Sequence, residues 1–114
     1  MQALSRLLRS ALYIVHTFMI FAGCSSADQS LRPALHIVEI REMKFQPSQL
    51  TISKGDTVLW INHDIVEHNI TEETSKIWGS PVIRSGESWS LVVEKSSDYF
   101  CSIHVVMKGK VLVK

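Results

Sequence analysis

The stretch Ser88-Trp89-Ser90-Leu91-Val92-Val93-Glu94 decides the fold class, because polar and apolar side chains alternate along most of it. The alternation places Trp89, Leu91 and Val93 on one face, whereas the serines fall on the other. A side-chain period of two is typical of a strand with one face buried and one face in water. The stretch therefore predicts a β-strand that packs against a core.

Outward from this stretch, further short runs rich in Val, Ile, Trp and Thr predict more strands. These runs are residues 35–41, 49–53, 57–62, 99–101 and 108–114. Turn sequences separate them, among them Lys54-Gly55-Asp56 and Ser85-Gly86-Glu87, and residues 67–78 form the least regular connection. Many short strands with turns between them predict an all-β sandwich with antiparallel or mixed sheets.

Length and composition exclude several classes of protein. The chain has 114 residues, 46% of them apolar and 20% charged, with a formal net charge of +1. One compact domain fits this length, and a disordered or acidic tail protein is excluded. The near-neutral charge argues against nucleic acid as a partner, and two cysteines exclude a scaffold of several disulfides.

The first residues have the layout of an export signal, with Arg6 and Arg9 ahead of an apolar run over residues 11–23. Phe21-Ala22-Gly23-Cys24 resembles the bacterial lipoprotein processing box, which implies cleavage after residue 23 and lipid attachment at Cys24. Ordinary cleavage near Ala27 and an uncleaved anchor remain open. We expect a signal peptide over 1–23, a flexible tether over 24–33 and a folded domain over 34–114. The domain would then be exported, periplasmic or otherwise extracytoplasmic, and anchored to a membrane.

The chemistry concentrates in Cys101-Ser102-Ile103-His104-Val105-Val106-Met107, where a thiol, an imidazole and a thioether lie within seven residues. His68 follows an earlier strand, and a β-sandwich readily brings two strand ends together. Two imidazoles and a thiolate with a weak axial thioether are the ligand types of a blue copper site. His68, Cys101, His104 and Met107 are therefore candidate ligands of one copper ion. The alternative is that Cys101 and Met107 simply pack in the core.

The order of several segments resembles the cupredoxins of the plastocyanin and pseudoazurin group, over nearly the whole of residues 38–114. The segments are Met43-Lys44-Phe45-Gln46-Pro47, Gly55-Asp56-Thr57-Val58, Trp60-Ile61-Asn62, His68-Asn69, Cys101 with His104 to Met107, and Gly109-Lys110-Val111. Within this group the chain looks most like the amicyanins, because two residues separate His104 from Met107. The resemblance implies a Greek-key β-sandwich with one type 1 copper ion and a role as a one-electron carrier.

The resemblance also assigns roles to residues of this chain. It implies that His68 and His104 are the imidazole ligands, Cys101 the thiolate and Met107 the axial ligand. The backbone N–H of Asn69 is expected to reach the sulfur. Because Asn69 directly follows His68, His68 is preferred to His63 as the ligand. Ile103 and Glu67 stand where members of the family often have proline.

These inferences predict an exported type 1 copper protein that shuttles single electrons between a donor and an acceptor redox protein. We expect transient partners, a monomeric carrier and no enzymatic activity, since four ligands leave no open coordination position. Partners would approach the edge of His104, with Val105 and Val106 supplying an apolar docking patch. Copper binding and delivery without electron transfer is the alternative function, and a metal-free interaction module is the other.

Overall fold

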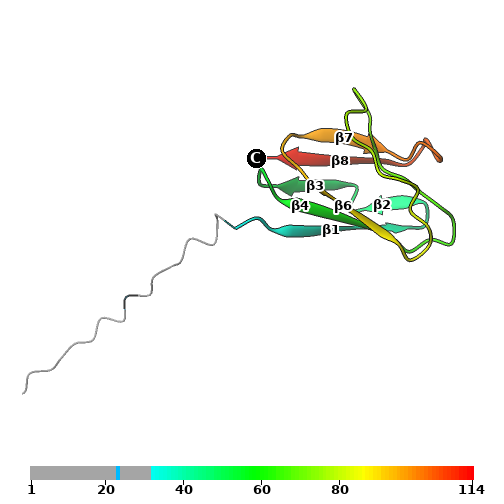
Figure 1. Cartoon of the computed structure of the whole chain (residues 1–114), viewed down its shortest axis with the longest axis horizontal. Helices are drawn as coiled ribbons and strands as arrows, with labels where there is room; N and C mark the ends of the chain where they lie inside the picture. Colours follow the sequence, from blue (N-terminus) through cyan, green and yellow to red (C-terminus); the bar gives the residue numbers. More distant parts are fainter. Residues whose placement is uncertain (1–22, 24–31) are drawn as a thin grey trace, which may run out of the picture.

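The structure is a computed structural model that describes Gly23 and residues 32–114. The signal peptide predicted over 1–23, apart from Gly23, and Cys24 with the tether up to residue 31 lie outside the described residues. The described part contains eight strands, most of which are labelled in Figure 1. They are β1 (Leu35–Arg41), β2 (Lys44–Gln46), β3 (Gln49–Ile52), β4 (Thr57–Asn62), β5 (Thr71–Glu72), β6 (Ser88–Val92), β7 (Ser97–Phe100) and β8 (Lys108–Val113).

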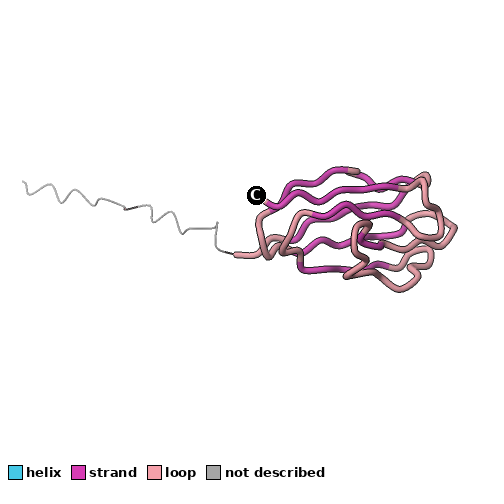
Figure 2. The backbone as a smooth tube through the Cα atoms, turned by 90° about the horizontal axis from the view of Figure 1, so that it is seen from above, coloured by secondary structure: helices cyan, strands magenta, loops and turns pink. Residues whose placement is uncertain are grey.

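The strands form two four-stranded sheets, one in the order β2-β1-β4-β6 and the other in the order β3-β8-β7-β5. The pairs β1–β4 and β3–β8 are parallel, and the other pairs are antiparallel. Figure 2 shows these strands running along the long axis of the domain, with loops gathered at its two ends. The predicted all-β sandwich is confirmed, and its sheets are mixed. Among the described residues, no helix is long and apolar enough to cross a bilayer.

The predicted strands differ from the observed ones mainly where pairing is short. β1 and β4 match their predicted ranges, whereas β7 begins and ends earlier than predicted and leaves Cys101 in the following loop. β2 and β5 were not predicted as strands from the alternation of side chains. β5 spans two residues and is defined by its pairing with β7, which is distant in the sequence, whereas β2 spans three residues and pairs with β1 directly before it. A period of two cannot be recognised over so few residues.

The core lies between the sheets and confirms the face assigned to β6, because Val93 is buried and Trp89 and Leu91 are half-buried. Trp60 is fully buried at its centre, with ring centroids 5.6 Å from Trp89 and 5.4 Å from Tyr99. Burial raises the pKa of Tyr99 to about 12. The tryptophans therefore serve as packing residues. Their large side chains fill the core of a small domain.

The two ends of the sandwich differ, and we call them the N-terminal pole and the ligand pole. The N-terminal pole holds residues 32–34, the turn 53–56, the loop 93–96 and Lys114. Asp56 fixes its geometry, because one carboxylate oxygen accepts the Ala34 N–H at 2.9 Å and the other lies 2.8 Å from His36 Nε2. These hydrogen bonds, that of Ala34 foremost, lower the pKa of Asp56. The ligand pole holds residues 63–70 and 101–107 at the opposite end (Figure 1).

Gly109 in β8 gives a test of the core packing, because it lies opposite Tyr99 of the neighbouring strand β7. A Cβ at this position would overlap the ring of Tyr99, whose side chain is fully buried. We expect Gly109→Ala to lower the free energy of unfolding by about 1–3 kcal/mol, the usual cost of overpacking a core. Chemical denaturation measures this change. Gly79→Ala is the matched control, since its Cβ would meet nothing closer than 3.6 Å; equal stability of the two variants would contradict the prediction.

Candidate metal centre

Three side chains from two loops converge at the ligand pole. His68 lies in the segment after β4, and Cys101 and His104 lie in the loop between β7 and β8. The two Nδ1 atoms are 3.2 Å apart, and the Cys101 sulfur lies 3.9 Å from Nδ1 of His68 and 3.8 Å from Nδ1 of His104. His68 and Cys101 are fully buried, whereas His104 is half-buried.

These separations fit donor atoms that share one metal ion. Nitrogen and sulfur ligands bind transition metals at roughly 2.0–2.3 Å, so two donors on one ion lie no more than about 4.5 Å apart. All three donor atoms lie within 4.8 Å of one another, and the individual separations are shorter. Two imidazoles and a thiolate favour a trigonal copper site with a weak axial ligand. The donor set therefore fits a type 1 copper ion.

Backbone hydrogen bonds give the loop its shape. The Cys101 N–H donates to the carbonyl of Met107 at 3.1 Å, and the Met107 N–H donates to the carbonyl of His104 at 2.9 Å. The first of these bonds joins the two ends of the seven-residue motif. Met107 directly precedes β8 and is buried, with 2% of its surface exposed.

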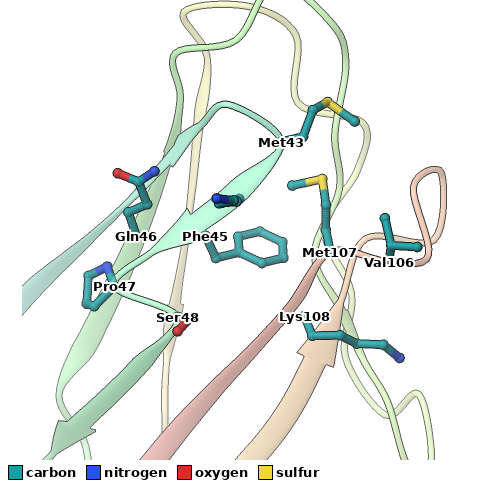
Figure 3. A pocket seen from close by; sticks show the side chains of 9 residues that line it. Met43, Phe45, Gln46, Pro47, Ser48, Val106, Met107 and Lys108 are labelled. Atoms are coloured by element: carbon teal, nitrogen blue, oxygen red, sulfur yellow. The ribbon is translucent and has the colours of Figure 1, made fainter.

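Met107 also borders a pocket of about 390 Å³ between β2 and this loop. Figure 3 shows Met107 and Met43 on the wall of this pocket, near the ring of Phe45. Met43 is 39% exposed, whereas Met107 is buried. The pocket thus connects an exposed thioether with the thioether proposed as a ligand.

The second ring nitrogen of His68 is held by Asp64. His68 Nε2 lies 2.8 Å from Asp64 Oδ2, and the carboxylate also accepts the backbone N–H groups of Glu42 at 2.8 Å and Met43 at 3.0 Å. Burial opposes ionisation of Asp64, but the hydrogen bonds from Met43, His68 and Glu42 outweigh it and hold its pKa below the usual range. A carboxylate at Nε2 favours the tautomer with its proton there, which leaves the Nδ1 lone pair free for a metal.

The Cys101 sulfur receives two backbone N–H groups. The Asn69 N–H lies 3.5 Å from the sulfur, the contact expected from the family resemblance, and the His104 N–H lies at 3.4 Å. These two contacts hold the sulfur between the segment after β4 and the loop between β7 and β8. The Asn69 side chain also joins the two loops, because its Nδ2 donates to Ser102 Oγ at 2.6 Å and its Oδ1 accepts the Ser102 N–H at 2.7 Å.

The structure separates the two histidines that compete in the sequence. His63 is exposed, with Nε2 3.4 Å from a carboxylate oxygen of Glu39, and does not belong to the donor cluster. Glu67, beside His68, lies 3.5 Å from Arg84 on the surface.

Four of the five residues between Cys101 and Met107 are exposed, and His104 is the half-buried one. Ile103, which replaces a family proline, is 46% exposed, and Val105 and Val106 are 60% and 84% exposed. Cys24, the predicted lipid attachment, lies outside the described residues.

Asp64, Ser102 and Met43 were not identified as site residues from the sequence. Asp64 stands four positions before His68, and the usual pairing of a histidine ligand with a carboxylate was the signal that could have found it. Ser102 lies inside the Cys101 motif but acts through Asn69, which is far away in the sequence. Met43 lies beside Met107 only because β2 and β8 come together.

Comparisons with known proteins agree with this geometry. Residues 34–114 match the model of the family described as copper binding proteins, plastocyanin/azurin family. The chain is 30% identical to the amicyanin of Paracoccus denitrificans over 100 residues, which is 82% of this chain and 72% of that protein. It is 32% identical to amicyanin-alpha of Methylorubrum extorquens over 104 residues, covering 86% of this chain and 87% of the relative.

Solved structures give the same result. The structure of a Cu(I) form of an amicyanin variant matches with a TM-score of 0.66 and 29% identity, covering 70% of this chain and 82% of the other. The oxidised state of another amicyanin variant matches with a TM-score of 0.66, 30% identity and the same coverage. With the fold, the donor cluster and the family match in agreement, the chain belongs to the copper-binding plastocyanin/azurin family, the cupredoxins, whose cofactor here is one type 1 copper ion.

Proposed function

We propose that this protein carries single electrons between two redox proteins outside the cytoplasm, with copper held by His68, Cys101, His104 and Met107. The observation that carries the proposal is the convergence of two imidazole nitrogens and one sulfur within 3.2–3.9 Å. When bound, type 1 copper takes up or releases one electron between Cu(II) and Cu(I). The amicyanin relatives support the carrier role rather than an enzymatic one.

The surroundings of the donor atoms suit a carrier because they restrict movement. Asp64 orients His68, the link between Asn69 and Ser102 joins the two loops, and the Cys101 to Met107 bond closes the ligand loop. Each contact is made by the protein itself and constrains the donors in either oxidation state. Burial of Cys101 also keeps water and oxidants away from the sulfur.

The half-buried ring of His104 is the proposed point of approach for redox partners. Val105 and Val106 flank it and expose apolar surface. An apolar contact of small area gives weak and short-lived binding, which suits a carrier that must release one partner before it meets the next. Four ligands also leave no position for a substrate, consistent with a protein that is not an enzyme.

Export and membrane attachment belong to the same proposal. The basic residues Arg6 and Arg9 and the apolar run over 11–23 support a cleaved signal peptide. Cys24, in the context Phe21-Ala22-Gly23-Cys24, is the proposed lipid attachment site. The domain would work as a monomer on a membrane face outside the cytoplasm.

Copper delivery is the second candidate function, and the pocket beside Met107 is the observation that favours it. Met43 presents a thioether at this pocket, and thioethers are ligands that Cu(I) prefers. An ion released from the centre could leave by this route. Copper that passes quickly to a chelator through this pocket, without electron exchange, would favour delivery over electron transport.

The first prediction from the proposed function concerns the copper centre. The exported protein titrated with Cu(II) should develop an intense visible thiolate-to-copper band that saturates at one equivalent and bleaches reversibly with ascorbate. Cys101→Ser should lose the band because it removes the thiolate, whereas His63→Ala should keep it. Absorption spectroscopy measures all three. A folded wild-type protein without such a band would leave copper handling without redox, or a metal-free interaction module.

The second prediction concerns Asp64. Asp64→Ala leaves His68 Nε2 without its acceptor, and losing such a partner typically costs about 10–100-fold in metal affinity. Competition with a copper chelator measures the affinity, and Asp64→Asn, which keeps one acceptor oxygen, should fall between. Glu72→Ala is the control, because Glu72 also accepts two backbone N–H groups but contacts none of the proposed ligands. Wild-type affinity in Asp64→Ala would refute the role given to Asp64.

The third prediction concerns docking through Val106. Electron self-exchange between oxidised and reduced copies, measured by NMR line broadening, needs two such faces to meet. Val106→Glu should slow self-exchange about tenfold, roughly 1.4 kcal/mol, by placing like charges in the contact while the visible spectrum stays unchanged. Ile77→Glu introduces the same charge at a residue that is 69% exposed outside the ligand pole, and should have little effect. Equal rates in the two variants would place the contact elsewhere.

A further inference from the structure

Four basic residues gather at the N-terminal pole, opposite the metal centre. They are Arg32, Lys54, Lys95 and Lys114, and all are exposed. Hydrogen bonds bring their segments together, because the Gly55 N–H donates to the carbonyl of Val93 at 2.9 Å and the Lys114 N–H donates to that of Ile52 at 3.0 Å. Figure 1 shows the end of β8 and the start of β1 at this same end of the domain.

These cations differ from most others in the domain. Arg41, Arg84, Lys108 and Lys110 each lie within 3.5 Å of a carboxylate. No carboxylate in the described part of the chain forms an ion pair with the four cations of the N-terminal pole. One exposed acidic side chain, Glu94, accompanies them, since Asp56 is buried against His36. The pole is therefore a positive patch on a nearly neutral protein.

An apolar surface adjoins this patch on the outer face of the first sheet. Leu35, Thr57 and Val92 are paired across β1, β4 and β6, so their side chains point to the same face. Leu35 is 61% and Val92 is 55% exposed, and Ile37, two residues further along β1, is 49% exposed. Further toward the ligand pole, the same face of β1 becomes charged, with Glu39 and Arg41.

We propose that the N-terminal pole and the adjoining apolar patch rest on an anionic lipid surface. Exposed lysine and arginine side chains are attracted to negatively charged lipid headgroups, and neighbouring aliphatic side chains gain by leaving water at the same boundary. The chain outside the structure joins the domain here, through Arg32, so the proposed anchor at Cys24 would hold this pole against the membrane. Only this role of the anchor at Cys24 rests on the proposed export and membrane attachment.

This orientation would leave the metal centre free. β1 has seven residues and runs from the N-terminal pole toward the ligand pole. A strand of this length spans about 20 Å, which is roughly the distance between the two poles. His104, Val105 and Val106 would then face away from the bilayer. Redox partners could approach them while the domain stays on the membrane.

Lysine acetylation followed by mass spectrometry tests the orientation. The protein purified after export is acetylated in the presence of vesicles of phosphatidylcholine alone, and separately in the presence of vesicles that also contain phosphatidylglycerol. We expect Lys54, Lys95 and Lys114 to react at least fivefold more slowly on the anionic vesicles. Lys44 and Lys108, outside this pole, should react equally on both, and high salt should remove the difference.

Charge reversal provides the matched control. Lys54→Glu combined with Lys95→Glu should abolish the protection of Lys114, whereas Lys44→Glu combined with Lys108→Glu changes the net charge equally and should leave Lys54 and Lys95 protected. Uniform labelling on both vesicles would overturn the inference. Protection that is independent of lipid charge and rises with protein concentration would also overturn it, in favour of a second copy of the chain as the occupant.

The same spectra separate this inference from the proposed anchor. The mass of the peptide containing Cys24 reports whether the cysteine carries acyl chains. Selective protection of Lys54 and Lys95 without acylation would support the lipid-binding pole and refute the anchor. Acylation of Cys24 without protection of the lysines would support the anchor and refute the lipid-binding pole. The visible copper band, measured on the same sample, tests the electron-carrier function independently of both.

Discussion

The hydrogen bond between Asp64 and the buried ring of His68 is the constraint on which the metal centre depends. It occupies Nε2 and so directs the Nδ1 lone pair toward Cys101 and His104. The same carboxylate holds the backbone of Glu42 and Met43, both of which have positive φ angles of 53° and 61°. One ionised group thus ties the turn before β2 to a proposed copper ligand, and its low pKa follows from serving both.

The sandwich contributes by ending two strands of different sheets at one pole. β4 leads toward His68 in the first sheet, and β7 leads into the loop with Cys101 and His104 in the second. The Asn69–Ser102 hydrogen bonds then join these two segments directly. Core packing around Trp60 and Tyr99 keeps the sheets in place, so the donor separations depend on the whole domain as well as on the local loop.

The two poles carry different chemistry. At the ligand pole, the exposed side chains of Val105 and Val106 flank the half-buried ring of His104, which suits brief contacts with other proteins. At the opposite pole, exposed aliphatic side chains and cations that form no ion pair within residues 32–114 suit a charged lipid surface. At that second pole Asp56 is buried beside His36 and fixes the start of β1, so its carboxylate is not part of the exposed surface.

The sequence alone determined the all-β class, most strand positions and the ligand types, because alternation along a strand and the Cys101 to Met107 spacing are local properties of the chain. The resemblance to cupredoxins added the preference for His68 over His63. Only the tertiary structure decided that Asp64 holds His68, that Ser102 joins Asn69, that β2 and β5 are strands and that four cations meet at one pole. Apart from β2, which pairs with the adjacent β1 but is too short to show a period, each of these features is a contact between distant segments or within an irregular loop. No periodic pattern reports which groups will meet there.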